Sequence, residues 1–107
     1  MMPVQLPAGA EQITVSDTAK SLLTLIREAA SAPDWKPERS NSVQIQVKTN
    51  SIRYSVSFTP TTTNGMLIST SNSDEWVRTD LSKIKVIRNG SSDATITIQV
   101  YEDNLNN

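Results

Sequence analysis

The acidic cluster of the sequence is the first group of side chains to weigh for chemistry. Asp74, Glu75 and Asp80 lie close together, and with Asn72 they could supply the hard oxygen ligands that Ca²⁺ prefers. A calcium-binding loop has a length of roughly twelve residues and a glycine at its sharp turn, and both features are missing. A paired-carboxylate hydrolase would need environments that separate an acid from a base, and the sequence gives these carboxyls none. We therefore interpret the cluster as a solvated loop.

The sequence lacks the residue types that most other catalytic sites require. Cysteine and histidine are absent, which removes thiolate metal sites, cysteine nucleophiles and the commonest general base. The three glycines, Gly9, Gly65 and Gly90, are too scattered for a phosphate loop or a dinucleotide fingerprint. No base candidate lies near the Ser, Thr, Lys or Tyr nucleophiles. We assign no catalytic, cofactor-binding or metal-ligating residue, expect no cofactor, and predict that the protein is not an enzyme.

Four basic residues could form a small strip on one sheet face. Lys83, Lys85 and Arg88, with Arg53, could contact an acidic protein surface or packaged DNA. The alternative is ordinary strand-face charge, which also discourages edge-to-edge aggregation. The formal net charge is -1, and a dedicated nucleic-acid binder needs a basic face. We therefore expect no specific nucleic-acid partner.

The large aromatic side chains allow a second kind of contact. Trp35, Trp76 and Tyr54 could line a sugar-binding surface by stacking on apolar sugar faces. Two tryptophans beside a single phenylalanine are more typical of core residues. Exposure of Trp76 or Tyr54 would favour the sugar-binding interpretation, and burial of both would exclude it.

The elements that position these residues follow from hydrophobic periodicity. Residues 1–10 read as an extended N-terminal arm, 11–101 as one helix-plus-β-sandwich domain, and 102–107 as a polar C-terminal tail. Apolar residues at helical spacing predict an amphipathic helix over about 18–30. Asp17, or alternatively Ser16, is the expected N-cap. With no stretch of 18 apolar residues and no basic leader, we expect neither a membrane partner nor a secretory signal.

After residue 42 the period changes to two, which is typical of strands with one wet face. Strands 43–48 and 52–58 read as an antiparallel hairpin around the turn Asn50-Ser51, and Asn89-Gly90 as a second hairpin turn. The other expected strands are 11–15, 66–70, 75–78, 83–88 and 94–101. The predicted fold class is mainly β: a single antiparallel β-sandwich or barrel of six or seven strands with one N-terminal helix.

The order of elements resembles a group of small tailed-bacteriophage virion proteins. The segments that carry the resemblance are Ile52-Arg53-Tyr54-Ser55-Val56, Thr59-Pro60-Thr61, Asn64-Gly65-Met66-Leu67-Ile68 and the closing alternating strand from Ala94 to Tyr101. It covers about residues 14–101. Many members have Asp-Gly before the Pro-Thr turn, whereas this chain has Ser57-Phe58-Thr59. The resemblance implies a β-sandwich that decorates or joins part of a virion, and it implies no catalytic residue.

We therefore expect a non-enzymatic bacteriophage virion structural protein, assembled in the host cytoplasm, that stabilises the capsid or joins head and neck components. Its partners would be capsid, neck or tail proteins, in a homo-oligomer or symmetric lattice. Candidate contact residues lie in the arm, the Pro-containing loop and the basic strip: Val4, Leu6, Trp35, Lys83 and Lys85. The alternative is a carbohydrate- or receptor-binding module on the virion.

Overall fold

A computed structural model describes residues 4–29, 40–70 and 75–104, and side chains within 9–29, 40–70 and 75–102. Its described part is mainly β, with one short α-helix. The elements are β1 (Val4–Val15), β2 (Lys20–Ser21), α1 (Leu22–Ala29), β3 (Ser42–Thr49), β4 (Ile52–Ser55), β5 (Met66–Ile68), β6 (Glu75–Val77), the 3₁₀ turn η2 (Leu81–Lys83), β7 (Lys85–Arg88) and β8 (Ala94–Asn104).

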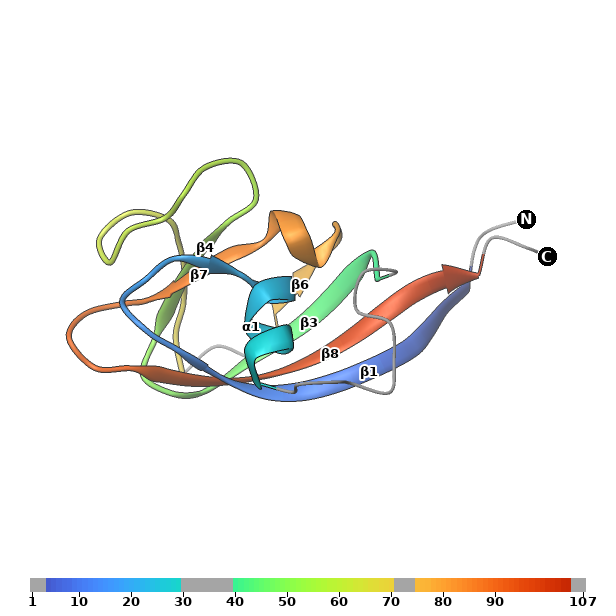
Figure 1. Ribbon diagram of the computed structural model, residues 1–107, viewed down its shortest axis with the longest axis horizontal. Coiled ribbons are helices and arrows are strands. Elements are labelled where there is room, and N and C mark those ends of the chain that lie inside the picture. The colour runs from blue at the N-terminus through green and yellow to red at the C-terminus, as the bar shows by residue number, and fades with distance from the viewer. Residues whose placement is uncertain (1–3, 30–39, 71–74, 105–107) are drawn as a thin grey trace.

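The described strands form two antiparallel sheets of four strands each (Figure 1). One has the order β1-β8-β3-β6 and is called sheet A here, and the other, sheet B, has the order β2-β7-β4-β5. The expected six or seven strands are therefore eight in the described residues. The added strand is β2, which pairs Lys20 with Val86 and Ser21 with Lys85 within the segment expected to begin the helix.

The two hairpins expected from the turn residues are wrong. β3 pairs with β6 and β8 in sheet A, whereas β4 pairs with β5 and β7 in sheet B. The chain changes sheets at Asn50, whose φ is 60° and whose Nδ2 donates to the carbonyl of Asp93 at 2.8 Å. Asn89-Gly90 likewise joins β7 of sheet B to β8 of sheet A. A turn-forming residue fixes a change of direction, but not whether the next strand pairs with the last.

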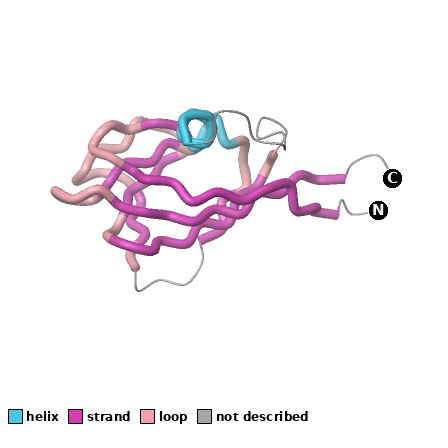
Figure 2. Tube along the Cα trace, turned by 60° about the horizontal axis from the view of Figure 1, so that its bottom comes forward, coloured by secondary structure: helices cyan, strands magenta, loops and turns pink. Residues whose placement is uncertain are grey.

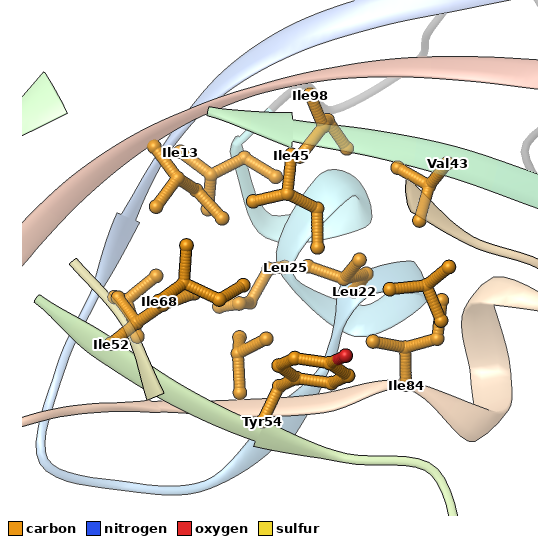
Figure 3. Packing of buried hydrophobic residues seen from close by; sticks show 14 of the residues in the cluster. Ile13, Leu22, Leu25, Val43, Ile45, Ile52, Tyr54, Ile68, Ile84 and Ile98 are labelled. Atoms are coloured by element: carbon orange, nitrogen blue, oxygen red, sulfur yellow. The ribbon is translucent and has the colours of Figure 1, made fainter. Parts of the chain in front are cut away.

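The inward faces of the two sheets enclose one hydrophobic core (Figure 3). Alternate residues of β3 and β8 point inward because successive side chains of a strand lie on opposite faces. Across the core lie Ile52 and Tyr54 of β4, with Leu22 and Leu25 of α1 between the sheets. The fully buried side chains include Ile13, Val15, Leu22, Ile26, Val43, Ile45, Ile52, Ile68, Leu81, Ile84, Ile96 and Ile98. As expected, Ile87 is buried as well as Ile84 and Val86.

The helix begins later than the sequence pattern predicts. It spans Leu22–Ala29, and neither Asp17 nor Ser16 is its N-cap. Ser21 holds that position instead, because its Oγ accepts a hydrogen bond from the backbone N–H of Thr24 at 3.1 Å. Leu22, Leu25 and Ile26 form its buried face.

Strand β1 runs far beyond residues 11–15. It pairs with β8 from Val15↔Ala94 to Val4↔Asn104, with a bulge between Pro7 and Gly9. β3 reaches along β8 only to Tyr101, so β1 and β8 form a two-stranded ribbon beyond that point. The ribbon tip projects at the end of the molecule where both termini lie (Figures 1 and 2). From Val4 on, the expected arm is thus paired sheet, and it gives the molecule its long axis of 46 Å against 29 and 24 Å.

In the part of the chain that the structure describes, α1 and η2 are too short and insufficiently apolar to cross a membrane.

Candidate functional site

The outer face of sheet A carries uncharged hydrogen-bonding side chains. Gln44 and Gln46 of β3 point away from the core, since Val43, Ile45 and Val47 between them are buried. The register places Gln44 opposite Gln99 and Gln46 opposite Thr97 of β8. Together they line a shallow hollow of about 200 Å³. We call this set, Gln44, Gln46, Thr97 and Gln99, the amide face.

An aromatic pair borders the amide face. Trp76 of β6 is the cross-strand partner of Gln44, and Tyr101 lies two residues beyond Gln99 on the same side of β8. The two ring centroids are 5.1 Å apart with a tilt of 36°. Trp76 is 45% exposed, so the sequence preference for a core tryptophan is wrong at this position. The phenol of Tyr101 donates to Oε1 of Gln99 at 3.2 Å, which joins the aromatic pair to the amide face.

The other large aromatic of the expected sugar surface faces the opposite way. Tyr54 is buried, and its phenol donates to Oε2 of Glu75 at 3.0 Å. Burial, together with this hydrogen bond and the nearby carboxylate charge, raises the pKa of Tyr54 from 10.0 to about 12. Since Tyr54 is on β4 and Glu75 on β6, the bond links sheet B to sheet A. Tyr54 is therefore a structural residue.

This bond also bears on the acidic cluster. Glu75 is turned toward Tyr54, and Asp80 is an exposed residue just before η2. Asn72 and Asp74 lie outside the described residues. Among the residues that are described, no group of three or more acidic side chains could hold a metal ion.

The expected basic strip divides into two parts. Arg53 donates from Nε to Oδ1 of Asn89 at 2.9 Å, and Arg88 from Nη1 to Oδ1 of Asp93 at 2.6 Å. These two guanidinium groups therefore tie strands and turns together. Lys83 and Lys85 instead lie at the opposite end of β7.

Lys83 and Lys85 line a groove of about 330 Å³ next to two exposed apolar side chains, Val56 and Phe58. Nζ of Lys85 donates to Oγ1 of Thr59 at 3.3 Å. We call this site, with Ser57, Thr59 and Ser82 completing its lining, the lysine groove. The expected strand 52–58 is wrong beyond Ser55, where β4 ends, and Val56 and Phe58 are exposed.

The other candidate contact residues lie partly outside the described structure. Val4 and Leu6 have their backbones in the ribbon, opposite Asn104 and Glu102, but their side chains are not among those described. Trp35 and its loop lie outside the described residues altogether. The structure thus brings Lys83 and Lys85 together, and it does not unite them with the arm.

The motif residues of the resemblance form a local structural cluster. Nη1 of Arg53 donates to the carbonyl of Gly65 at 3.0 Å, and Nε of Arg53 approaches the carbonyl of Thr62 at 3.3 Å. Gly65 has a φ of 136°, and a side chain there would lie 3.1 Å from Cβ of Pro60 and 3.2 Å from the carbonyl oxygen of Tyr54. The motif residues Arg53, Tyr54, Pro60 and Gly65 therefore have a structural role, because their contacts hold the loop between β4 and β5.

Sequence reasoning missed the amide face as a site. The alternation of polar and apolar residues predicts that these side chains face solvent, but not that β8 lies beside β3. The available signal was a row of uncharged polar residues: Gln44 and Gln46 alternate with buried apolar residues in one segment, and Thr97 and Gln99 do so in the other.

Neither a protein-family model, nor a curated protein, nor a solved structure matches this chain.

Proposed function

We propose that this chain is a non-enzymatic structural protein that decorates or joins parts of a tailed-bacteriophage virion through protein–protein contacts. The observation that carries the proposal is the projecting β1–β8 ribbon. Within the described residues β1 pairs only with β8, so its outer edge presents unpaired backbone groups along the ribbon. Such an edge is a ready template for a strand of another protein.

The ribbon has the features of a strand edge kept for a specific partner. Pro7 and the adjoining bulge interrupt the edge, which limits indiscriminate pairing with other chains. The ribbon tip lies beyond the core, so a partner can pair with it without disturbing Ile13 or Val15. A standard interface of about 800 Å² per partner is within reach of a ribbon supplemented by neighbouring loops.

A second contact surface lies away from the ribbon. The lysine groove is close to the loops and edge strand that carry most of the exposed large apolar side chains: Val56, Phe58, Met66 and Leu67. Exposed apolar clusters of this kind mark interaction sites. The groove suits an apolar side chain flanked by acidic residues.

Two unlike surfaces favour a head-to-tail arrangement. Contacts between dissimilar patches generate rings or open lattices, whereas a single self-complementary patch gives a dimer. Repetition in a lattice makes modest contacts collectively tight. The virion context is supported by the order of elements and by the cluster of Arg53, Tyr54, Pro60 and Gly65. We further propose that the two sheets act as a β-sandwich scaffold for both surfaces.

The test is sedimentation of the purified chain, alone and with capsids and tails of the phage that encodes it. The full chain is expected to co-sediment. A chain that begins at Ala8 lacks the ribbon tip but keeps the core pairing from Gly9 to Val15, so it is expected to fold and to lose at least about tenfold in binding. If the full chain neither self-associates nor co-sediments with particles, the proposal is wrong.

A further inference from the structure

We infer that the outer face of sheet A, with Trp76, Tyr101 and the amide face, is a binding site for a neutral, hydroxyl-rich glycan. The site goes beyond the assembly role and does not depend on it. It lies on a different surface from the lysine groove, and it does not require the ribbon tip.

The aromatic pair supplies the apolar part of the site. Trp76 is 45% exposed while packed on Tyr101, so apolar ring area remains in water that a ligand can cover. The contact with Tyr101 restricts the orientation of the indole. A restrained aromatic ring offers a large apolar area with little further entropy to lose on binding. Flat apolar patches of C–H groups, such as those of pyranose rings, match that area.

The hydrogen-bonding side chains beside the rings supply the polar part of the site. Each glutamine offers a carbonyl acceptor and two N–H donors, and a threonine hydroxyl both donates and accepts. Sugar hydroxyls also donate and accept, so the Thr97 and Gln99 side chains in the lining of the hollow match them chemically. The bond from Tyr101 to Oε1 of Gln99 restricts the orientation of that amide in the lining of the hollow. The amide and hydroxyl side chains beside the aromatic rings are therefore complementary to the hydroxyl groups of a sugar.

Charge and size restrict the class of ligand. None of the four side chains that line the hollow is charged, and Lys48, on the same outer face, has its Nζ 3.5 Å from Oε1 of Gln12. A hollow whose lining carries no fixed charge gives an acidic or basic ligand no countercharge at the site, which favours a neutral one, and Lys48 lies outside that lining. The hollow of about 200 Å³ is smaller than the sites of about 300–1,000 Å³ that enclose drug-sized ligands. It therefore fits one sugar unit, with neighbouring units lying across the open sheet.

The experiment is titration of the full chain with soluble neutral polysaccharides, namely a glucan, a mannan and a galactan, and with heparin as an acidic one. Calorimetry and tryptophan fluorescence, in a Trp35→Phe background that leaves Trp76 as the reporter, measure binding. We expect at least one neutral polymer to bind and to change Trp76 emission. The affinity should be nearly independent of salt, since no ion pairs form.

Matched variants locate the site. Trp76→Ala is expected to weaken binding at least about tenfold, because it removes the stacking surface. Gln99→Ala should weaken it by a smaller factor, and Trp76→Tyr should retain part of it. Phe58→Ala, an equally exposed aromatic on sheet B's side of the molecule, should leave binding unchanged. Circular dichroism establishes whether each variant is folded. If Trp76→Ala does not fold, the loss of binding in Gln99→Ala still tests the site.

Three results would overturn the inference. They are the absence of binding to all neutral polymers, binding to heparin alone, and equal losses in Phe58→Ala and Trp76→Ala. Self-association that Trp76→Ala abolishes, without glycan binding, would identify the face as an interface between copies and would also overturn it. If no neutral polymer binds but capsid co-sedimentation is lost without the ribbon tip, the glycan inference is wrong and the assembly proposal stands alone.

Discussion

At the scale of single residues, Tyr54 connects the two sheets by donating to Glu75. Its raised pKa means that the folded state holds the phenolic proton more tightly than the unfolded chain does. The stabilisation is fully present below pH 10 and is lost as the pH rises from 10.0 toward about 12. We predict that the free energy of unfolding falls across this range, measured by urea denaturation at successive pH values.

Tyr54→Phe is the control for that titration. It removes the hydroxyl and keeps the buried ring, so at neutral pH we expect a loss of about 1 kcal/mol in the free energy of unfolding. Above pH 10 the variant should lose less stability than the parent. Parallel pH curves for the two proteins would show that the phenol of Tyr54 does not carry the effect.

Two glycines with positive φ differ in what surrounds them. A Cβ added at Gly65 would meet Pro60, Arg53 and the Tyr54 carbonyl at 3.1–3.2 Å, whereas one added at Gly90 would have nothing within 4 Å. Gly90→Ala should cost only backbone strain, about 1–2 kcal/mol. Gly65→Ala should cost that strain plus the displacement of its neighbours, and so at least about 1 kcal/mol more. Thermal and urea unfolding of both variants measure the difference, and equal losses would contradict it.

At the scale of elements, two serines compete to begin the helix. Ser21 caps α1 by accepting from Thr24 at 3.1 Å, while Ser16 accepts from Thr18 at 3.4 Å in the preceding turn. Ser21→Ala should lower the free energy of unfolding by about 1 kcal/mol, because a helix N–H loses its partner. Ser16→Ala should have a much smaller effect. A larger loss at Ser16 would favour the earlier helix start.

The sequence pattern predicted which segments are strands much better than how they pair. Inward residues such as Ile45, Ile96 and Ile98 follow from alternation alone, because the period of two is a property of each strand. Pairing depends on where the chain crosses between sheets, and Asn50 looks the same in a hairpin turn as in a crossover. The ends of β1 and α1 also depend on strand pairing. β1 is extended because it pairs with β8, and α1 is shortened because Lys20 and Ser21 form β2 instead.

The candidate site was hard to predict for the same reason. Trp76 could be judged exposed only once β6 was known to lie at the edge of sheet A, with Val77 taking the inward position. Gln44 and Gln99 are far apart in sequence, so the β3–β8 register was needed to unite them. The uncharged side chains of Gln44 and Gln99 were visible in the sequence, but they point to a site only when the register places them on one face.

At the scale of the whole molecule, the pairing of β1 with β8 closes the chain on itself. Val4 lies opposite Asn104, so the two ends of the described chain are adjacent (Figure 1). In the natural order this pairing joins the most distant parts of the sequence. Loop-closure entropy opposes such contacts until late in folding, and folding rates fall as contacts become less local.

A circular permutant makes this contact local without changing the fold. Joining the natural termini by a short Gly-Ser linker, and opening the chain between the exposed Ser91 and Ser92, turns β8 and β1 into a hairpin. No strand pairing is cut, because β7 and β8 belong to different sheets. We predict several-fold faster refolding with a nearly unchanged unfolding rate, measured by stopped-flow fluorescence. A second permutant with the same joint, opened between Arg78 and Thr79, where β6 of sheet A leads to β7 of sheet B, should show the same acceleration if the new hairpin is its cause. Refolding that is no faster in either permutant would mean that β1 and β8 meet only after the rate-limiting step.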